Sequence, residues 1–339
     1  MNDRTRVLAA VGLTVLLFLG VQLGALALVE PFDASERQAV DDPENPTNSI
    51  VYFAIILVAT GIMLAAFKFD LQWLIRLLII GVSVMLAWFV FTEFLPPVAE
   101  IAGVNVPAAV AAIGVGAALL WYPEWYVIDT TGVLMGAGAA ALFGISFGLL
   151  PALLLLTVLA VYDAISVYGT EHMLDLAEGV MDLKIPVVLV VPTTLSYSYL
   201  AAGSTDDVLE DGGRKAADDG DGAAGAENDD RNDAEPADDD ELGRDALFIG
   251  LGDAVIPTIL VASAAFFLDA GTIAVPGIVL NAPALGALLG TIAGLLVLMY
   301  MVLKGRPHAG LPLLNGGAIG GYLLGAVASG VSLVTALGL

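Results

Sequence analysis

The chain has 339 residues, of which 58% are hydrophobic and only 14% are charged. An ordinary soluble domain carries about 25% charged residues, so the composition excludes that class of protein. Cysteine is absent, which excludes disulfides, thiol catalysis and cysteine-bound metals. The twelve Lys and Arg residues are few and scattered, so no nucleic-acid partner is expected.

Apolar runs of about 20 residues recur along the chain, and each can cross the roughly 30 Å of a bilayer's hydrocarbon core. They predict an all-α, polytopic membrane protein with nine transmembrane helices. The first run is too long for a signal peptide and lacks a convincing cleavage site, so it is read as the first helix. The expected helices are 7–29, 50–67, 76–95, 104–121, 127–149, 151–172, 246–268, 277–303 and 311–337.

A long loop, residues 173–245, divides the helices into a first group of six (1–172) and a second group of three (246–339). Segment 185–200 is apolar but short and contains two prolines, which favours a re-entrant or interfacial segment. Its valine-rich part is a hypothetical partner for an unwound substrate strand. Residues 203–243 are rich in Asp, Gly and Ala and are expected to form a disordered acidic linker.

Charge predicts both the environment and the orientation. Residues 201–245 hold 17 acidic and 4 basic side chains, and so carry −13 of the net charge of −24. Such acidity suits a high-salt cytoplasm, where self-repulsion is screened. With the N-terminus in the cytoplasm, eleven of the twelve Lys and Arg residues lie inside and only Arg37 lies outside. The positive-inside rule therefore predicts a multi-pass protein of the cell membrane with a cytoplasmic N-terminus and an extracellular C-terminus.

Two carboxylates, Asp163 and Asp253, lie well inside the predicted spans. Ionisable groups at this depth are costly and mark functional sites, and no Lys or Arg in the two helices neutralises either one. An inner loop joins the two helices, and both place the aspartate on the order of 10–14 Å below the inner surface. We therefore expect the carboxylates to face each other.

Two facing carboxylates in a low-dielectric site are expected to share one proton, which is the arrangement that aspartic proteases use. The ionised partner takes a proton from water, and the protonated partner donates a hydrogen bond to the peptide carbonyl. The same pair suits an ion- or proton-coupled transporter or cation leak channel, and spacing and depth favour neither function. A transporter is expected to show inverted repeats with broken helices, and no clear pair of such halves is present.

Two short motifs surround the aspartates. Tyr162-Asp163 in one helix and Gly250-Leu251-Gly252-Asp253 in the next resemble the YD and GLGD motifs of the presenilin and signal peptide peptidase family of intramembrane aspartyl proteases. Nine helices and a long loop after the sixth extend the resemblance over essentially the whole chain, which looks like an archaeal presenilin homologue. The resemblance implies an aspartic endopeptidase that cleaves the transmembrane helices of single-span proteins. Asp163 and Asp253 would be catalytic, without a cofactor, and a homo-oligomer is left open.

The family's third motif, PAL followed by Pro, opens the last helix. Here that position holds Ala309-Gly310-Leu311-Pro312, which keeps only the Leu and the final Pro. The resemblance implies that this segment shapes the active site and receives substrate. The glycines beside Asp253 expose the backbone, so a substrate strand can approach. Tyr162 is expected either to hydrogen-bond near the aspartate pair or contact substrate, or to have a plain packing role. A literal Pro283-Ala284-Leu285 lies too early, in the eighth helix.

Two other motifs are set aside. No H-E-x-x-H is present, and the two histidines, His172 and His308, are expected at the membrane interface, so no metal site is predicted. The sequence Asp129-Thr130-Thr131-Gly132 matches the D-T-G of soluble aspartic proteases only superficially.

Overall fold

The structure is a computed structural model that describes the chain except for residues 1–2, 70, 170–184, 194–196, 201–245 and 305–308. The predicted acidic linker and both histidines lie outside the described residues. The helices are α1 (Asp3–Ala34), α2 (Thr47–Lys68), α3 (Gln72–Phe94), α4 (Val106–Trp121), α5 (Trp125–Ser146), α6 (Leu149–Gly169), α9 (Leu251–Phe267), α10 (Ala282–Val302), α11 (Gly310–Ala328) and α12 (Leu333–Ala336). The strands are β1 (Glu100–Ile101), β2 (Val104–Asn105), β3 (Val188–Pro192) and β4 (Ala246–Gly250).

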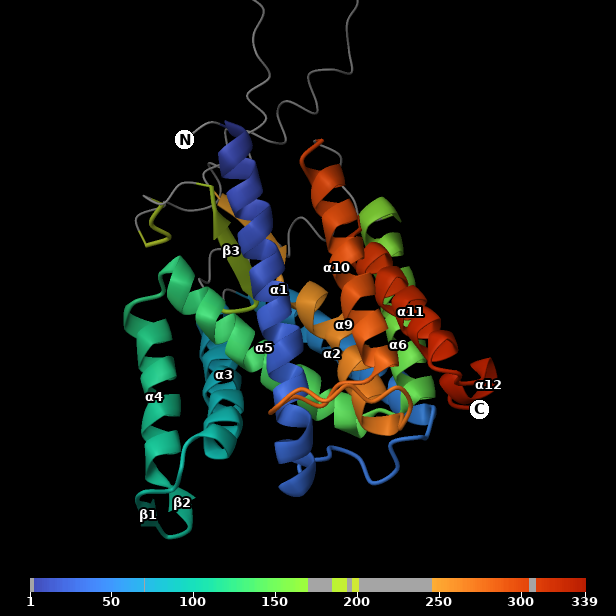
Figure 1. The fold of residues 1–339 in the computed structure, drawn as a ribbon. Coiled ribbons are helices and arrows are strands. Elements are labelled where there is room, and N and C mark those ends of the chain that lie inside the picture. The colour runs from blue at the N-terminus through green and yellow to red at the C-terminus, as the bar shows by residue number, and fades with distance from the viewer. Residues whose placement is uncertain (1–2, 70, 170–184, 194–196, 201–245, 305–308) are drawn as a thin grey trace, which may run out of the picture.

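Helices of membrane-spanning length dominate the described chain. Seven of them are long and apolar enough to cross a bilayer, and α4 and α9 are shorter apolar helices. The predicted all-α, polytopic membrane class is therefore confirmed, while the number of nine spans stays a prediction. Within the bundle, α1, α5 and α9 pack against one another, and α6, α10 and α11 pack around α9 (Figure 1).

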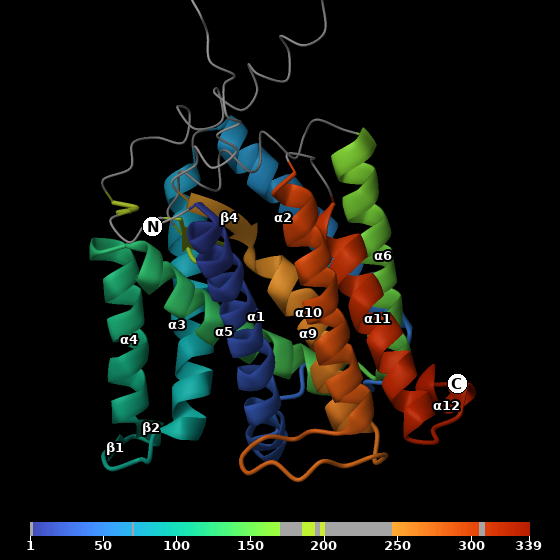
Figure 2. The same cartoon turned by 45° about the horizontal axis from the view of Figure 1, so that its top comes forward.

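The predicted seventh helix, 246–268, is wrong at its start. Residues Ala246–Gly250 form β4, which pairs with β3, and the helix begins only at Leu251. The apolar sequence Ala-Leu-Phe-Ile-Gly is compatible with either a helix or a strand. It forms a strand here because it pairs with the valine-rich β3, which is distant in sequence. Figure 2 shows β4 leading into α9.

The predicted ninth helix, 311–337, is wrong at its end. Helix α11 stops at Ala328, because Gly330 adopts the left-handed conformation with φ of +82° and turns the chain. A short helix, α12, follows and is tied back to α11 by the Tyr322 hydroxyl, which donates a hydrogen bond to the Ala336 carbonyl at 2.6 Å.

Glycines bring α10 and α11 into close backbone contact. A Cβ placed on Gly290 would meet the Gly317 carbonyl oxygen, and one on Gly321 would meet that of Gly286. Small residues permit such close packing of helices in lipid. The contact sets the position of α11 and therefore of its first residues, which belong to the site described below.

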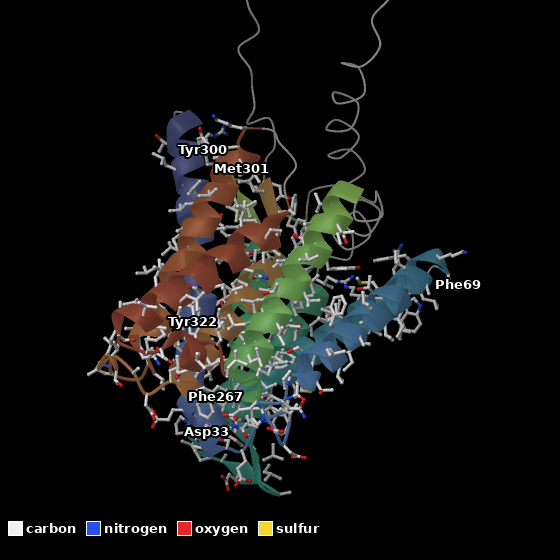
Figure 3. The ribbon with its side chains drawn as sticks, turned by 90° about the vertical axis from the view of Figure 1, so that its right-hand side faces the viewer. Asp33, Phe69, Phe267, Tyr300, Met301 and Tyr322 are labelled. Atoms are coloured by element: carbon white, nitrogen blue, oxygen red, sulfur yellow. The ribbon has the colours of Figure 1, made fainter. Side chains whose placement is uncertain are left out.

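Helix α2 is the most loosely packed span. The Ser49 hydroxyl donates a hydrogen bond to the Pro151 carbonyl at 2.6 Å, which fastens the start of α2 to α6. Towards its other end, at Phe69, α2 leans away from α6 (Figure 3).

Candidate active site

Asp163 lies in the second half of α6 and is buried. Its Oδ2 accepts a hydrogen bond from the main-chain N–H of Leu311 at 3.1 Å. Leu311 is in the first turn of α11, where main-chain N–H groups have no partner within the helix. The helix start thus holds the carboxylate with a free amide donor and with the positive end of the helix dipole.

Asp253 lies in the first turn of α9 and is partly buried. Its Oδ2 would be 3.2 Å from a Cβ placed on Gly310, the residue before Leu311. Two consecutive residues at the start of α11 therefore contact the two aspartates. The carboxylate of Asp253 also lies within electrostatic range of Asp163, so the two acidic groups lie in the same region of the bundle.

The two glycines that precede Asp253 are exposed, and they carry the chain from β4 into α9. A cavity of about 180 Å³ opens beside them and reaches Asp253. One wall is β4 and the start of α9, and the other is the end of α10 with the start of α11. Its lining residues are Leu247, Phe248, Ile249, Gly250, Asp253, Leu295, Leu298, Met299, Val302 and Gly310. An apolar cavity thus adjoins a carboxylate.

The register of β3 and β4 determines which backbone groups face this cavity. Val190 lies opposite Phe248, and the N–H of Leu251 donates to the Val187 carbonyl at 2.8 Å. Hydrogen-bonded and non-hydrogen-bonded pairs alternate along an antiparallel ribbon, so Val190 and Phe248 form a non-hydrogen-bonded pair. Phe248 therefore directs its main-chain groups to the outer edge of β4, and Gly250 directs its N–H there, since the Gly250 carbonyl accepts the first hydrogen bond of α9. Among the described strands, β4 pairs only with β3, so no described strand lies along this edge.

The other predicted site residues fall into two groups. Ala309 is buried and directly precedes α11, and Pro312 lies in the first turn of that helix, so the two flank Gly310 and Leu311. Leu251 is buried in the core beside Leu189 of β3. Tyr162 instead packs edge-on against Phe53 of α2, with ring centroids 5.9 Å apart.

The literal Pro-Ala-Leu of the eighth predicted helix is remote from Asp253. It opens α10, where Asn281 caps the helix by accepting from the Ala284 N–H at 2.8 Å. The Asn281 amide also donates to the Leu268 carbonyl, just past the end of α9, whereas Asp253 lies at the start of that helix.

Three buried polar residues near the site were not predicted from the sequence. Asp129 accepts a hydrogen bond from the Val190 N–H at 2.7 Å, and Glu124 accepts one from the Tyr199 N–H at 3.0 Å. Asn315 of α11 donates to the Leu156 carbonyl of α6 at 2.9 Å. A polar residue inside a predicted span is the signal that could have identified Asp129 and Asn315.

The comparisons with known proteins agree with this geometry. The family model described as "Signal-peptide peptidase, presenilin aspartyl protease" matches residues 15–331. Two similar solved structures are both of a presenilin family intramembrane aspartate protease, in space groups C222 and P2. No curated protein matches the chain.

The likeness to both structures is extensive. The first is 31% identical, covers 94% of this chain and 99% of its own, and has a TM-score of 0.61. The second is 32% identical, covers 93% of this chain and 96% of its own, and has a TM-score of 0.58. The chain therefore belongs to the presenilin and signal-peptide peptidase family of intramembrane aspartyl proteases.

Proposed function

We propose that Asp163 and Asp253 are the catalytic pair of this protease and that they share one proton. The observation that carries the proposal is the start of α11, where Leu311 contacts one carboxylate and Gly310 contacts the other. The comparisons favour a protease over an ion-coupled transporter, because the matching family and both similar structures are proteases.

The Leu311 amide indicates how the roles divide. A main-chain N–H that donates to a carboxylate favours its ionised form, so Asp163 is the base that takes a proton from water. The resulting hydroxide oxygen bonds to the carbonyl carbon, while Asp253 gives its proton to the carbonyl oxygen. The tetrahedral intermediate then loses the amine, which takes the proton held by Asp163, while one hydroxyl of the intermediate returns a proton to Asp253 and restores the starting pair. One peptide bond and one water become an acid and an amine.

The outer edge of β4 is proposed to hold the substrate. A transmembrane helix must unwind before its peptide bonds can be attacked, because its main-chain groups are already hydrogen-bonded. The outward main-chain groups of Phe248 and the N–H of Gly250 supply new partners to the unwound strand beside Asp253. The cavity between β4 and α10 then takes one apolar substrate side chain.

The substrates are proposed to be single-span membrane proteins with extracellular N-termini. The basic residues support a cytoplasmic N-terminus for this chain, since eleven of twelve then lie on one side together with loop 173–245. This orientation resembles that of presenilin and is opposite to that of signal peptide peptidases, and it implies the substrate orientation. In that topology segment 185–200 is part of the cytoplasmic face. Paired substrates with the same apolar segment in opposite orientations test this, and cleavage of only the opposite orientation would contradict it.

The catalytic assignment is tested in liposomes with a single-span substrate. Wild type, Asp163→Ala and Asp253→Ala are compared, and the products are identified by mass spectrometry. The proposal predicts wild-type cuts within the apolar segment and none with either variant. Asp269→Asn, an exposed carboxylate beyond the end of α9, is the matched control and should cleave normally. Wild-type cleavage by either alanine variant would exclude the pair as the catalytic centre.

A further inference from the structure

The two edges of the β3–β4 ribbon differ in a way that the catalytic pair does not explain. Because Val190 and Phe248 form a non-hydrogen-bonded pair, the Val190 N–H points outward on the β3 side. Oδ1 of Asp129 in α5 accepts a hydrogen bond from this N–H, with a distance of 2.7 Å between the oxygen and the nitrogen. The Val190 N–H on the β3 edge is therefore already bonded, whereas β4 has no second partner among the described strands.

Burying the Asp129 carboxylate costs more free energy than the single hydrogen bond that it makes would require. Its side chain is 3% exposed, and its Oδ2 is buried without a hydrogen-bond partner in the described part of the chain. Burying a carboxylate oxygen unpaired is costly, and an apolar residue beside a simple structural strand would avoid that cost. The residue is thus a candidate for a role in the reaction.

A second acidic residue, at the N-terminal boundary of α5, bonds a residue that packs against β4. Glu124, which directly precedes α5, is 7% exposed and accepts from the Ser198 hydroxyl at 2.6 Å and the Tyr199 N–H at 3.0 Å. The Tyr199 ring in turn packs against Phe248, with centroids 6.0 Å apart. Glu124 therefore holds Tyr199, whose ring packs against Phe248, and Asp129 holds Val190, which lies opposite Phe248 in the ribbon.

Glycine at position 132 lets the ribbon approach α5. A Cβ there would be 3.1 Å from the Leu189 side chain of β3 and 3.7 Å from the Pro186 carbonyl. Leu189 and Val190 are themselves fully buried. The ribbon consequently packs closely on α5, and the Asp129 carboxylate bonds it at Val190. Figure 1 shows β3 at the end of the bundle where α1 begins.

We propose that Asp129, with Glu124, is a positioning residue that sets which peptide bond of the substrate is cut. The inference rests on the proposed addition of substrate to β4. By fixing Val190, Asp129 fixes Phe248 on the opposite strand, and the outward groups of Phe248 set the register of the added strand against Asp253. Asp129 acts only through the ribbon and touches neither the substrate nor the reacting atoms.

The test compares Asp129→Val, Asp129→Asn and wild type in liposomes with one single-span substrate. Valine fills a similar volume without an acceptor, and asparagine keeps the acceptor without the charge. The control is Thr130→Val, since the exposed Thr130 hydroxyl bonds only within α5, to the Tyr126 carbonyl. Cleavage positions, KM, kcat and the melting temperature are measured for each variant.

We expect Asp129→Val to spread cleavage over neighbouring peptide bonds and to raise KM about tenfold, the effect of losing one ordinary hydrogen bond. Asp129→Asn should restore the wild-type positions, and Thr130→Val should match wild type. Wild-type positions and KM for Asp129→Val overturn the proposal. The proposal is also overturned if Asp129→Val and Asp129→Asn change cleavage positions and KM equally and both lower the melting temperature. That result would show that Asp129 has a purely structural role.

A further variant keeps the test decisive where Asp129→Val fails to fold. Asp129→Glu retains the acceptor and the charge but moves them by one methylene, so it should shift the cleavage positions while cleavage continues. Unchanged positions with Asp129→Glu contradict the proposal. Failure of the catalytic assignment is distinguishable, because it would appear as cleavage by Asp163→Ala or Asp253→Ala.

Discussion

The main-chain N–H of Leu311 donates a hydrogen bond to Oδ2 of Asp163, and the two residues are separated by 148 positions in sequence. The bond links the start of the last long helix to a carboxylate in the middle of the chain. Gly310 meets Asp253 at the same point. The divergent segment Ala309–Pro312 therefore still lies beside both aspartates. The Leu311 N–H bonds Asp163, and the absence of a side chain at Gly310 leaves room for Asp253.

Removing the amide donor of Leu311 should slow the chemical step. Leu311→Pro deletes the N–H without breaking a helical hydrogen bond, because the residue lies in the first turn of α11. A hydrogen bond to a charged group contributes about 1.5–3 kcal/mol, so kcat should fall about 10- to 100-fold. Leu311→Ala keeps the N–H and serves as the control. Equal kcat values for the two variants would contradict the role of the amide.

Gly310→Ala should lower activity while the protein stays folded. The new Cβ would be 3.2 Å from Asp253 Oδ2 and 3.4 Å from the Leu298 side chain, so both must shift by a few tenths of an ångström. A displacement of about 1 Å at a catalytic group can cost about 100-fold, and this smaller shift should cost several-fold in kcat. Gly316→Ala on the same helix meets open space and is the control. A wild-type rate for Gly310→Ala would show that Asp253 tolerates the contact.

Two neighbouring glycines of α11 should respond differently to the same change. A Cβ at Gly321 would collide with the Gly286 carbonyl of α10, whereas one at Gly320 meets nothing within 4 Å. Gly321→Ala should therefore lower the free energy of unfolding by about 1–3 kcal/mol, the usual cost of overpacking. Gly320→Ala should leave it unchanged or raise it slightly, because alanine favours the helix. Thermal unfolding in one detergent compares the two, and equal melting temperatures would contradict the close helix contact.

Activity should pass through a maximum as pH changes. Above the range in which Asp163 and Asp253 share one proton, both are ionised and none is left to donate to the carbonyl. Below that range both are protonated, and no base remains to activate water. Initial cleavage rates in liposomes across the pH scale give the profile. A rate that rises steadily through about pH 9 would contradict a shared proton.

The long helices could be predicted from the sequence because each is a local property of an apolar run. Helix α3 begins at Gln72 and ends at Phe94, within a few residues of the predicted 76–95. The aspartate pair could also be predicted, since carboxylates in apolar runs are rare and two lay at matching depth. The GLGD and YD motifs then indicated the family that the comparisons show.

The ribbon beside the active site could not be predicted in the same way. Strand β4 has an apolar sequence compatible with a helix, and it becomes a strand because β3, far away in sequence, pairs with it. The role of Asp129 depends on its contact with Val190, 61 residues later, which no local pattern encodes. Gly310 also becomes meaningful only when α10 and α11 bring it to Asp253.

The central claim, that both aspartates act in the chemical step, is tested most directly with Asp163→Asn and Asp253→Asn in single-turnover cleavage. Each variant is first shown to bind a single-span substrate with wild-type affinity, so that only the chemistry differs. Since acid–base groups contribute at least about 100-fold, the rate of product formation should fall by at least that factor in each variant. A variant that binds substrate and cleaves it at the wild-type rate would contradict the account.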